Sequence, residues 1–166
     1  MLIDMMKLAI LIALMLPMGC FCQSNGNGML GKVEKFPMTN GQVMKTNPSS
    51  IYACRGNPGL FIYASHDSVF SLSQVKVCAV FDIGDEIGIV TRDDCGTFYA
   101  YTNLGSCFAE KGNHLQKGAF MGQAKFDDDE KLFKLLLMVV ADNQYISEEN
   151  IWKLIKGSDE QILQFQ

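Results

Sequence analysis

Residues 75–124 decide the fold, and they read VKVCAVFDIGDEIGIVTRDDCGTFYAYTNLGSCFAEKGNHLQKGAFMGQA. Short apolar runs alternate here with turns that contain glycine, which is the pattern of consecutive antiparallel strands. We predict strands at 75–81, 87–91 and 97–101. Gly96 stands in the turn before the third strand, where the backbone often needs a left-handed residue. The stretch therefore predicts a β-rich domain.

The flanking sequence extends the same pattern and adds a helix. Residues 131–140 are apolar on both faces after Lys134, as in a central strand. Ser147 is a good helix N-cap, and Gly157 is placed to end that helix. The predicted fold class is mainly β, an antiparallel sheet or sandwich with one short C-terminal helix. The apolar face of the predicted helix is formed by Ile151, Trp152, Leu154 and Ile155. Further strands are predicted at 31–36, 42–44, 51–54, 60–64 and 68–72.

The N-terminus has the features of an export signal. Leu8 to Leu16 is an uninterrupted apolar run, too short to span a bilayer but suited to a signal-peptide core. The sequence is compatible with signal-peptide cleavage after Cys22 and, alternatively, with a lipoprotein signal that places a lipid anchor at Cys20. We expect an exported protein of the periplasm or cell envelope, with a membrane link only through that anchor. The expected divisions are a signal peptide at 1–22, a flexible leader at 23–30, one domain at 31–157 and a tail at 158–166.

Net charge bears on the class of partner that the chain can bind, and cysteine content bears on whether it can form disulfides. The formal net charge is −4 at pH 7, which argues against a nucleic-acid partner because such partners favour basic patches. Four cysteines remain after the predicted cleavage. An exported chain meets an oxidising compartment, so these cysteines can form disulfides in three alternative pairings or stay as buried thiols. They are Cys54, Cys78, Cys95 and Cys107.

The order of elements resembles the lysostaphin/LytM-type zinc endopeptidases, which cut peptidoglycan cross-links. The likeness lies in the Gly84-Asp85 turn, the aromatic strand that leads into residues 101–104 (YTNL), and the turn between Gly112 and Gly118. Residues 51–70 and 136–152 resemble further segments of that family. The likeness covers about residues 47–156. It implies the family's antiparallel fold, the duplicated hybrid motif.

The metal-binding positions of that family carry other residues in this chain. The resemblance places the zinc-ligand and proton-transfer histidines and the aspartate on Ser49, Ala53, Asn103, Phe133 and Leu135. None of these side chains binds zinc as imidazole and carboxylate do. We therefore predict no catalytic residue, no metal and no cofactor. The chain's two histidines, His66 and His114, are predicted to be exposed in turns away from the groove.

An apolar groove is expected where the catalytic floor would be. The candidate binding aromatics are Tyr52, Tyr99 and Tyr101, because aromatic side chains are favoured anchors for peptides and sugars. An equal alternative is that these residues pack against one another and fill the space. The acidic run at 127–130 lacks the spacing of a calcium loop and is predicted to be a solvated turn.

The sequence thus favours an exported, catalytically inactive lysostaphin-type homologue that binds a cell-envelope partner. The expected partner is a peptidoglycan peptide or a cell-wall hydrolase. The alternative is an active zinc endopeptidase with non-standard ligands, and only this alternative requires zinc. A third hypothesis is a purely structural envelope domain with no ligand in the groove.

Overall fold

The computed structural model of the chain describes residues 29–33, 35–45 and 59–163. These residues form strands and a C-terminal helix, in agreement with the predicted fold class. The strands are β1 (Met29–Lys32), β2 (Gln42–Lys45), β3 (Leu60–Ala64), β4 (Ser68–Phe70), β5 (Val75–Ile83), β6 (Glu86–Arg92), β7 (Phe98–Cys107), β8 (His114–Leu115), β9 (Phe120–Asp127), β10 (Leu132–Ala141) and β11 (Gln144–Tyr145), and the helix is α3 (Glu148–Leu163).

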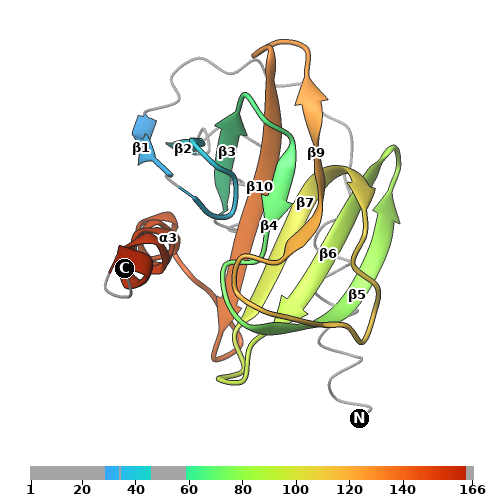
Figure 1. Ribbon diagram of the computed structural model, residues 1–166, viewed down its shortest axis with the longest axis vertical. Coiled ribbons are helices and arrows are strands. Elements are labelled where there is room, and N and C mark those ends of the chain that lie inside the picture. Colours follow the sequence, from blue (N-terminus) through green and yellow to red (C-terminus); the bar gives the residue numbers. More distant parts are fainter. Residues whose placement is uncertain (1–28, 34, 46–58, 164–166) are drawn as a thin grey trace.

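All strand pairs are antiparallel, and β10 lies at the centre of the sheet (Figure 1). The strand order is β1-β2-β3-β10-β9-β7-β6-β5-β8, with β4 added beside β9 and β11 beside β10. One end of β10 pairs with β9, and the rest pairs with β7. The prediction of a central strand at 131–140 is confirmed.

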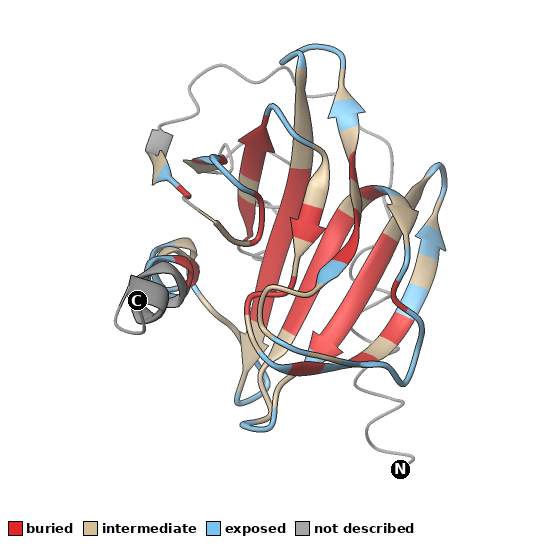
Figure 2. Cartoon of the chain, viewed as in Figure 1, coloured by how far each residue is buried: buried red, intermediate tan, exposed pale blue. Residues whose placement is uncertain are grey.

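Strand β10 separates two apolar clusters because its side chains alternate between the two faces of the sheet. Leu135, Leu137 and Val139 point into the main core, whereas Leu136 and Met138 belong to a smaller cluster on the opposite face. We call that opposite side the outer face. In Figure 2, buried residues are red, and they follow one another along β10, β7 and β6. Consecutive buried residues in a strand mean that both faces of the sheet are covered there.

The main core lies between two layers. In Figure 1, β4 and the first part of β9 pass in front of β10 and β7. Val69 of β4 and Met121 of β9 are fully buried and share the main core with Leu135 and Leu137. The aromatic side chains that flank these two residues, Phe70 and Phe120, are not fully buried.

The glycine turns have the predicted left-handed backbone. Gly96 has a φ of 90°, and Gly84, in the turn between β5 and β6, has a φ of 64°. A side chain is strained in this region, so glycine is the least costly residue at both turns. The hairpins β5–β6 and β6–β7 are therefore determined by local sequence.

Strands β7 and β9 show the largest differences from the prediction. Strand β7 continues to Cys107, beyond the predicted end at Tyr101. Strand β9 was not predicted, because its sequence FMGQAKFD places glycine and polar residues among a few apolar ones. Strand β9 pairs with β4 and β7 along its first part and with β10 at its end, and this pairing holds it in the sheet. Tertiary contacts, more than β-propensity, explain this strand.

Helix α3 begins as predicted and ends later. The backbone N–H of Asn150 donates to the Ser147 hydroxyl at 3.4 Å, which confirms the N-cap. The prediction that Gly157 ends the helix is wrong, because α3 continues to Leu163. Ile151 and Ile155 are fully buried and attach the helix to the main core, while Leu154 is 41% exposed.

Several predictions concern residues outside the described part of the chain. These are the signal peptide, the lipid anchor at Cys20, the thiol of Cys54 and the strand at 51–54. Strand β1 begins at Met29, within the stretch predicted as a leader, and pairs with β2 at the edge of the sheet. No helix of the described residues is both long and apolar enough to cross a membrane.

Candidate functional site

A charged cluster lies on the outer face, where β10 meets its neighbours near the β9–β10 turn. Lys134 of β10 is opposite Tyr63 of β3 on one side and Lys125 of β9 on the other. Because Lys134 alternates with the core residues Phe133 and Leu135, its side chain points to the outer face.

The Lys134 ammonium has an anionic partner and two aromatic ones. It lies 3.0 Å from a carboxylate oxygen of Asp127, and the two side chains are 24% and 17% exposed. It also lies 4.8 Å from the ring centre of Phe61 and 5.8 Å from that of Tyr63. Such cation–π contacts gain strength when the cation is partly removed from water. Lys134 is therefore held in a fixed position.

These contacts shift the pKa values of the pair. Burial alone would lower the pKa of Lys134, but the nearby Tyr63 and Asp127 outweigh it and raise that pKa. Burial would raise the pKa of Asp127, but the hydrogen bonds from Lys134 and from two backbone N–H groups outweigh it and lower that pKa. Both groups are charged at neutral pH.

A second ion pair completes the cluster. Lys125 is bonded to the carboxylate of Asp85, which lies in the turn between β5 and β6 and is 83% exposed. The pKa of Glu86 is raised, first by burial, with Lys125 acting in the opposite direction. The set of charged and phenolic groups, which we call the Lys134 cluster, is Lys134, Asp127, Lys125, Asp85, Glu86 and Tyr63.

An apolar strip continues from the cluster along the outer face. Leu136 is opposite Phe61 on β3 and Thr102 on β7, and Met138 is opposite Ala100. The centre of the strip is buried, with Leu136 1% exposed. Its margin is only half-buried and is formed by Phe61, Cys78, Phe81 and Phe98.

Three of the positions that match metal ligands, Asn103, Phe133 and Leu135, lie within the described residues. Leu135 is fully buried in the main core, and Phe133 packs against the same core. Asn103 is half-buried on β7 with a left-handed φ of 66°. The residues that follow these two positions in β10, Lys134 and Leu136, point to the outer face. Ser49 and Ala53 lie outside the described residues.

The predicted binding tyrosines that can be placed are core residues. Tyr101 is fully buried, and its hydroxyl accepts a hydrogen bond from the Leu72 N–H at 3.3 Å. Tyr99 is 6% exposed, and its hydroxyl donates to Asp93 at 2.9 Å. Burial raises the pKa of both phenols. Both residues belong to the main core. Tyr52 lies outside the described residues.

Both histidines of the chain are exposed in the structure. His66 is exposed between β3 and β4, and His114 is exposed on β8 opposite Lys76. His114 therefore lies in a short edge strand, where a turn was predicted. Over the ranges that the structure describes, no group of three or more His, Cys, Asp or Glu side chains is placed to hold a metal ion.

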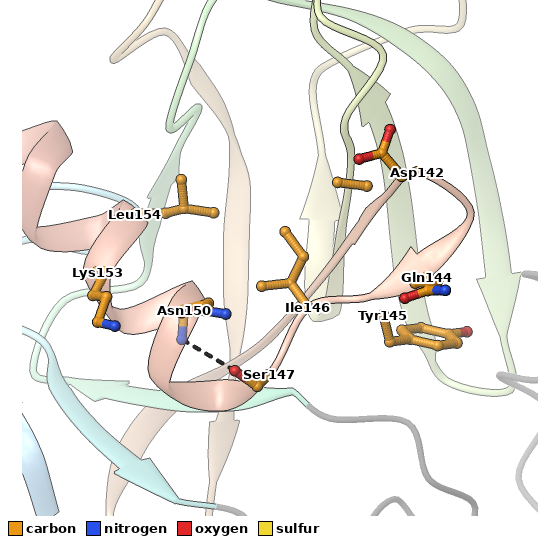
Figure 3. A pocket seen from close by; sticks show the side chains of 9 residues that line it. Asp142, Gln144, Tyr145, Ile146, Ser147, Asn150, Lys153 and Leu154 are labelled. Atoms are coloured by element: carbon orange, nitrogen blue, oxygen red, sulfur yellow. Dashed lines mark hydrogen bonds between the residues drawn. The ribbon is translucent and has the colours of Figure 1, made fainter.

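A shallow cavity of about 730 Å³ lies between the β10–β11 hairpin and α3 (Figure 3). Asp142, Gln144 and Tyr145 come from the hairpin side, and Asn150 and Leu154 come from the helix. The Tyr145 hydroxyl is buried without a hydrogen-bond partner among the described residues. The residues that line this cavity include no histidine and no cysteine.

Comparisons with known proteins give structural likeness without sequence likeness. No protein-family model matches the chain, and no curated protein does. The solution structure of lysostaphin matches at 11% identity and a TM-score of 0.47, over 80% of this chain. A zinc-containing peptidase from Vibrio cholerae matches at 15% identity and a TM-score of 0.45, over 72% of this chain. A complex of SpoIIIAH and SpoIIQ matches at 9% identity and a TM-score of 0.42, over 78% of this chain and 94% of the matched one.

The chain is shorter than the two peptidases. It spans 51% of the lysostaphin chain and 35% of the Vibrio cholerae chain.

Sequence reasoning missed the Lys134 cluster. Asp127 was assigned to a solvated turn, but it is mostly buried and accepts hydrogen bonds from Lys134 and from the N–H groups of Asp129 and Glu130. The available signal was a lysine inside an otherwise apolar strand, because a charge at such a position is rarely buried without a partner.

Proposed function

We propose that this chain is an exported cell-envelope domain, of lysostaphin-type descent, that binds its partner without cutting it. The partner is a peptidoglycan peptide or a cell-wall hydrolase. The proposal is supported by the resemblance over residues 47–156 in the order of strands and turns. It is also supported by the side chains Asn103, Phe133 and Leu135, none of which binds zinc as imidazole and carboxylate do.

The observation that carries the proposal is the Lys134 ammonium on the outer face of the central strand. Its raised pKa keeps it positively charged at neutral pH. A divalent cation about 4 Å from an ammonium meets a repulsion of roughly 8 kcal/mol at an effective dielectric constant of ~20. Asp127, the carboxylate that offsets this charge, is already bonded to Lys134. The site therefore favours ion pairing over zinc binding.

The composition of the Lys134 cluster suits a peptide partner. Both signs of charge are present, and the Lys125–Asp85 pair is accessible, with side chains 36% and 83% exposed. The half-buried rings of Phe61 and Phe81 lie at the margin of the adjoining apolar strip. Peptidoglycan stem peptides carry carboxylates, amines and methyl groups, which match such a surface.

Binding to peptidoglycan sacculi tests the proposal. The purified chain is sedimented with purified sacculi, beside the variant Lys125→Ala/Asp85→Ala. The control is Lys131→Ala/Asp128→Ala, which removes an exposed pair, 75% and 91% exposed, in the nearby turn. We expect the first variant to reduce binding by roughly fivefold, because two contacting charges are lost. The control is expected to bind as the parent does.

A second arm tests the hydrolase partner. The rate at which a lysostaphin-type hydrolase digests sacculi is measured with and without the chain. A changed rate supports a hydrolase partner, and sedimentation with sacculi supports a peptidoglycan one. A chain that neither sediments with sacculi nor changes the rate of digestion contradicts the proposed function.

A further inference from the structure

Strand β5 lies near one edge of the sheet, and half of its length is open on the outer side (Figure 1). Its neighbour on that side, β8, is two residues long and pairs with Val75 and Lys76. From Ala79 to Ile83, β6 is the only described strand that pairs with β5. An open edge of this kind presents backbone N–H and C=O groups to which another extended segment can bind.

The register shows which backbone groups of the open half point outward. The two-residue turn at 84–85 joins β5 to β6 and places Ile83 opposite Glu86. Residues that flank such a turn exchange both of their backbone hydrogen bonds, and the direction of bonding alternates along an antiparallel strand. Val80 and Asp82 therefore direct their N–H and C=O groups away from β6.

Val77 shows the same alternation on the other side of a bulge. The register of β5 against β6 shifts between Val77 and Ala79, so Val77 points outward although Ala79 points toward β6. The N–H of Val77 donates to the carbonyl of Asn113 at 2.9 Å, and its carbonyl accepts the N–H of Gly112 at 2.9 Å. The segment around β8 thus satisfies the outward groups before the bulge and none of those after it.

The outward groups of Val80 and Asp82 make no hydrogen bond with the part of the chain that the structure describes. Both side chains are exposed, Val80 at 37%. Phe81 lies between them on the opposite face, where it is half-buried at the margin of the apolar strip. The edge therefore offers backbone donors and acceptors with apolar surface on both faces.

Asp82 determines which segment suits this edge. Its carboxylate is exposed and forms no ion pair with a described residue. The nearest charged residues along the chain, Asp85 and Glu86, are also acidic, and Lys125 is bonded to Asp85. Facing residues of opposite charge stabilise a strand pair, whereas like charges destabilise it. A second copy, paired antiparallel through Val80 and Asp82, would bring two Asp82 carboxylates to one face. A segment with a basic residue there is complementary.

From this arrangement we infer that the open half of β5 is a docking edge for an extended protein segment, which joins the sheet as an additional strand. The segment carries an apolar residue opposite Val80 and a Lys or Arg opposite Asp82, two positions apart and therefore on one face. Backbone pairing supplies the affinity, and these two side chains supply the selectivity. The inference does not depend on the proposed function, which rests on the Lys134 cluster.

Peptide selection followed by N-methylation of the selected peptide tests the inference. Random dodecapeptides are selected on the full chain, with counter-selection on Val80→Pro, which lacks one outward N–H and suits an edge strand at that position. The affinity of the strongest binder is measured for the parent, for Asp82→Lys and for the control Asp94→Lys. Asp94 is an exposed turn residue, so the control makes the same change of charge elsewhere. Circular dichroism shows whether each variant is folded.

We expect the selected peptides to carry an apolar and a basic residue two positions apart. N-methylation should weaken binding roughly tenfold at alternate peptide residues, whose N–H groups face β5, and change it little at the residues between. Asp82→Lys should weaken binding roughly two- to fivefold, and Asp94→Lys should leave it unchanged. Bound peptide should slow the amide exchange of Val80 and Asp82, whereas the Phe81 amide, paired with Gly88, should be protected already.

Several results overturn the inference. An absence of enriched peptides does so, as does an effect of N-methylation that does not alternate along the peptide. Peptides with an acidic residue opposite Asp82, or equal loss of affinity in Asp82→Lys and Asp94→Lys, also contradict it. Self-association that protects the amides of Val80 and Asp82 without peptide would assign the edge to a second copy instead. If Val80→Pro does not fold, selection is run without it, and N-methylation and amide exchange decide because neither changes the chain.

Discussion

The Lys134 ammonium and the Asp127 carboxylate lie 3.0 Å apart, and each side chain is less than one-quarter exposed. The two residues come from adjacent antiparallel strands, β10 and β9, joined by the acidic turn. A partly buried ion pair costs solvation, so each member depends on the other. The contact can therefore be tested through the free energy of unfolding and through its dependence on pH.

Removing one member of the pair should destabilise the fold. Lys134→Met leaves Asp127 mostly buried without its cation, and we expect a loss of about 2 kcal/mol in the free energy of unfolding. The double variant Lys134→Met/Asp127→Leu should be less destabilised than the sum of the two single variants. Urea unfolding measures all four proteins. Additive effects would show that the two side chains do not interact.

Acidic pH should weaken the same contact. The folded pKa of Asp127 lies below its ordinary value, so the contact stabilises above the unfolded pKa of about 3.9 and is lost as pH falls through the folded pKa. The stability difference between the parent and Asp127→Asn should therefore be largest near neutral pH and shrink below about pH 4. Denaturant unfolding over pH 3–7 measures it. A difference that stays constant with pH argues against a charged contact.

Gly157 offers a test of the helix boundary. A Cβ at this position meets no atom within 4 Å, and α3 continues past it. Gly157→Ala should stabilise the chain by about 0.5–1 kcal/mol, because alanine suits a helix interior. If Gly157 instead ended the helix in a left-handed conformation, the same change would destabilise it. Thermal unfolding distinguishes the two outcomes.

Gly122→Ala is the same substitution as Gly157→Ala at a position where the added Cβ has no room, so the opposite effect on stability is expected. A Cβ there would overlap the carbonyl oxygen of Ser106 on the neighbouring strand β7. We expect a loss of about 2–3 kcal/mol, because backbone atoms have little room to move. Urea unfolding, run beside Gly157→Ala, measures it. A neutral Gly122→Ala would show that β7 and β9 lie further apart at this point.

Tyr101→Phe distinguishes a core residue from a binding residue. The change removes the hydroxyl that accepts the Leu72 N–H inside the core. We expect a loss of about 1 kcal/mol in stability, with unchanged sedimentation with sacculi. Reduced sedimentation at full stability would instead return Tyr101 to the binding surface that the sequence predicted. Urea unfolding and sedimentation are measured on the same preparation.

Local signals explain which parts of the fold could be predicted. The turns at Gly84 and Gly96 and the N-cap at Ser147 depend on neighbouring residues, and the sequence was sufficient for them. Strand β9 depends on pairing with β4 and β7 as well as with the next strand, β10, so its own residues gave little indication. The end of α3 was misplaced because a glycine can also lie within a helix.

The site was harder to predict than the fold. The side chains of Phe133 and Leu135 cannot bind a metal, and this is clear from the sequence. The face of the sheet to which they point is not. A shift of one residue along β10 exchanges the core for the outer face, which is how Lys134 was overlooked. The burial of Tyr99 and Tyr101 likewise depends on which side of β7 covers the core.

The proposal that this domain binds without cutting is tested most directly by one measurement. Purified sacculi are incubated with the chain and added zinc, and the released fragments are identified by mass spectrometry, with a lysostaphin-type hydrolase as positive control. We predict no fragments above background. Fragments from cleaved cross-links that disappear on chelation of zinc would contradict the proposal and establish the chain as a metal-dependent endopeptidase.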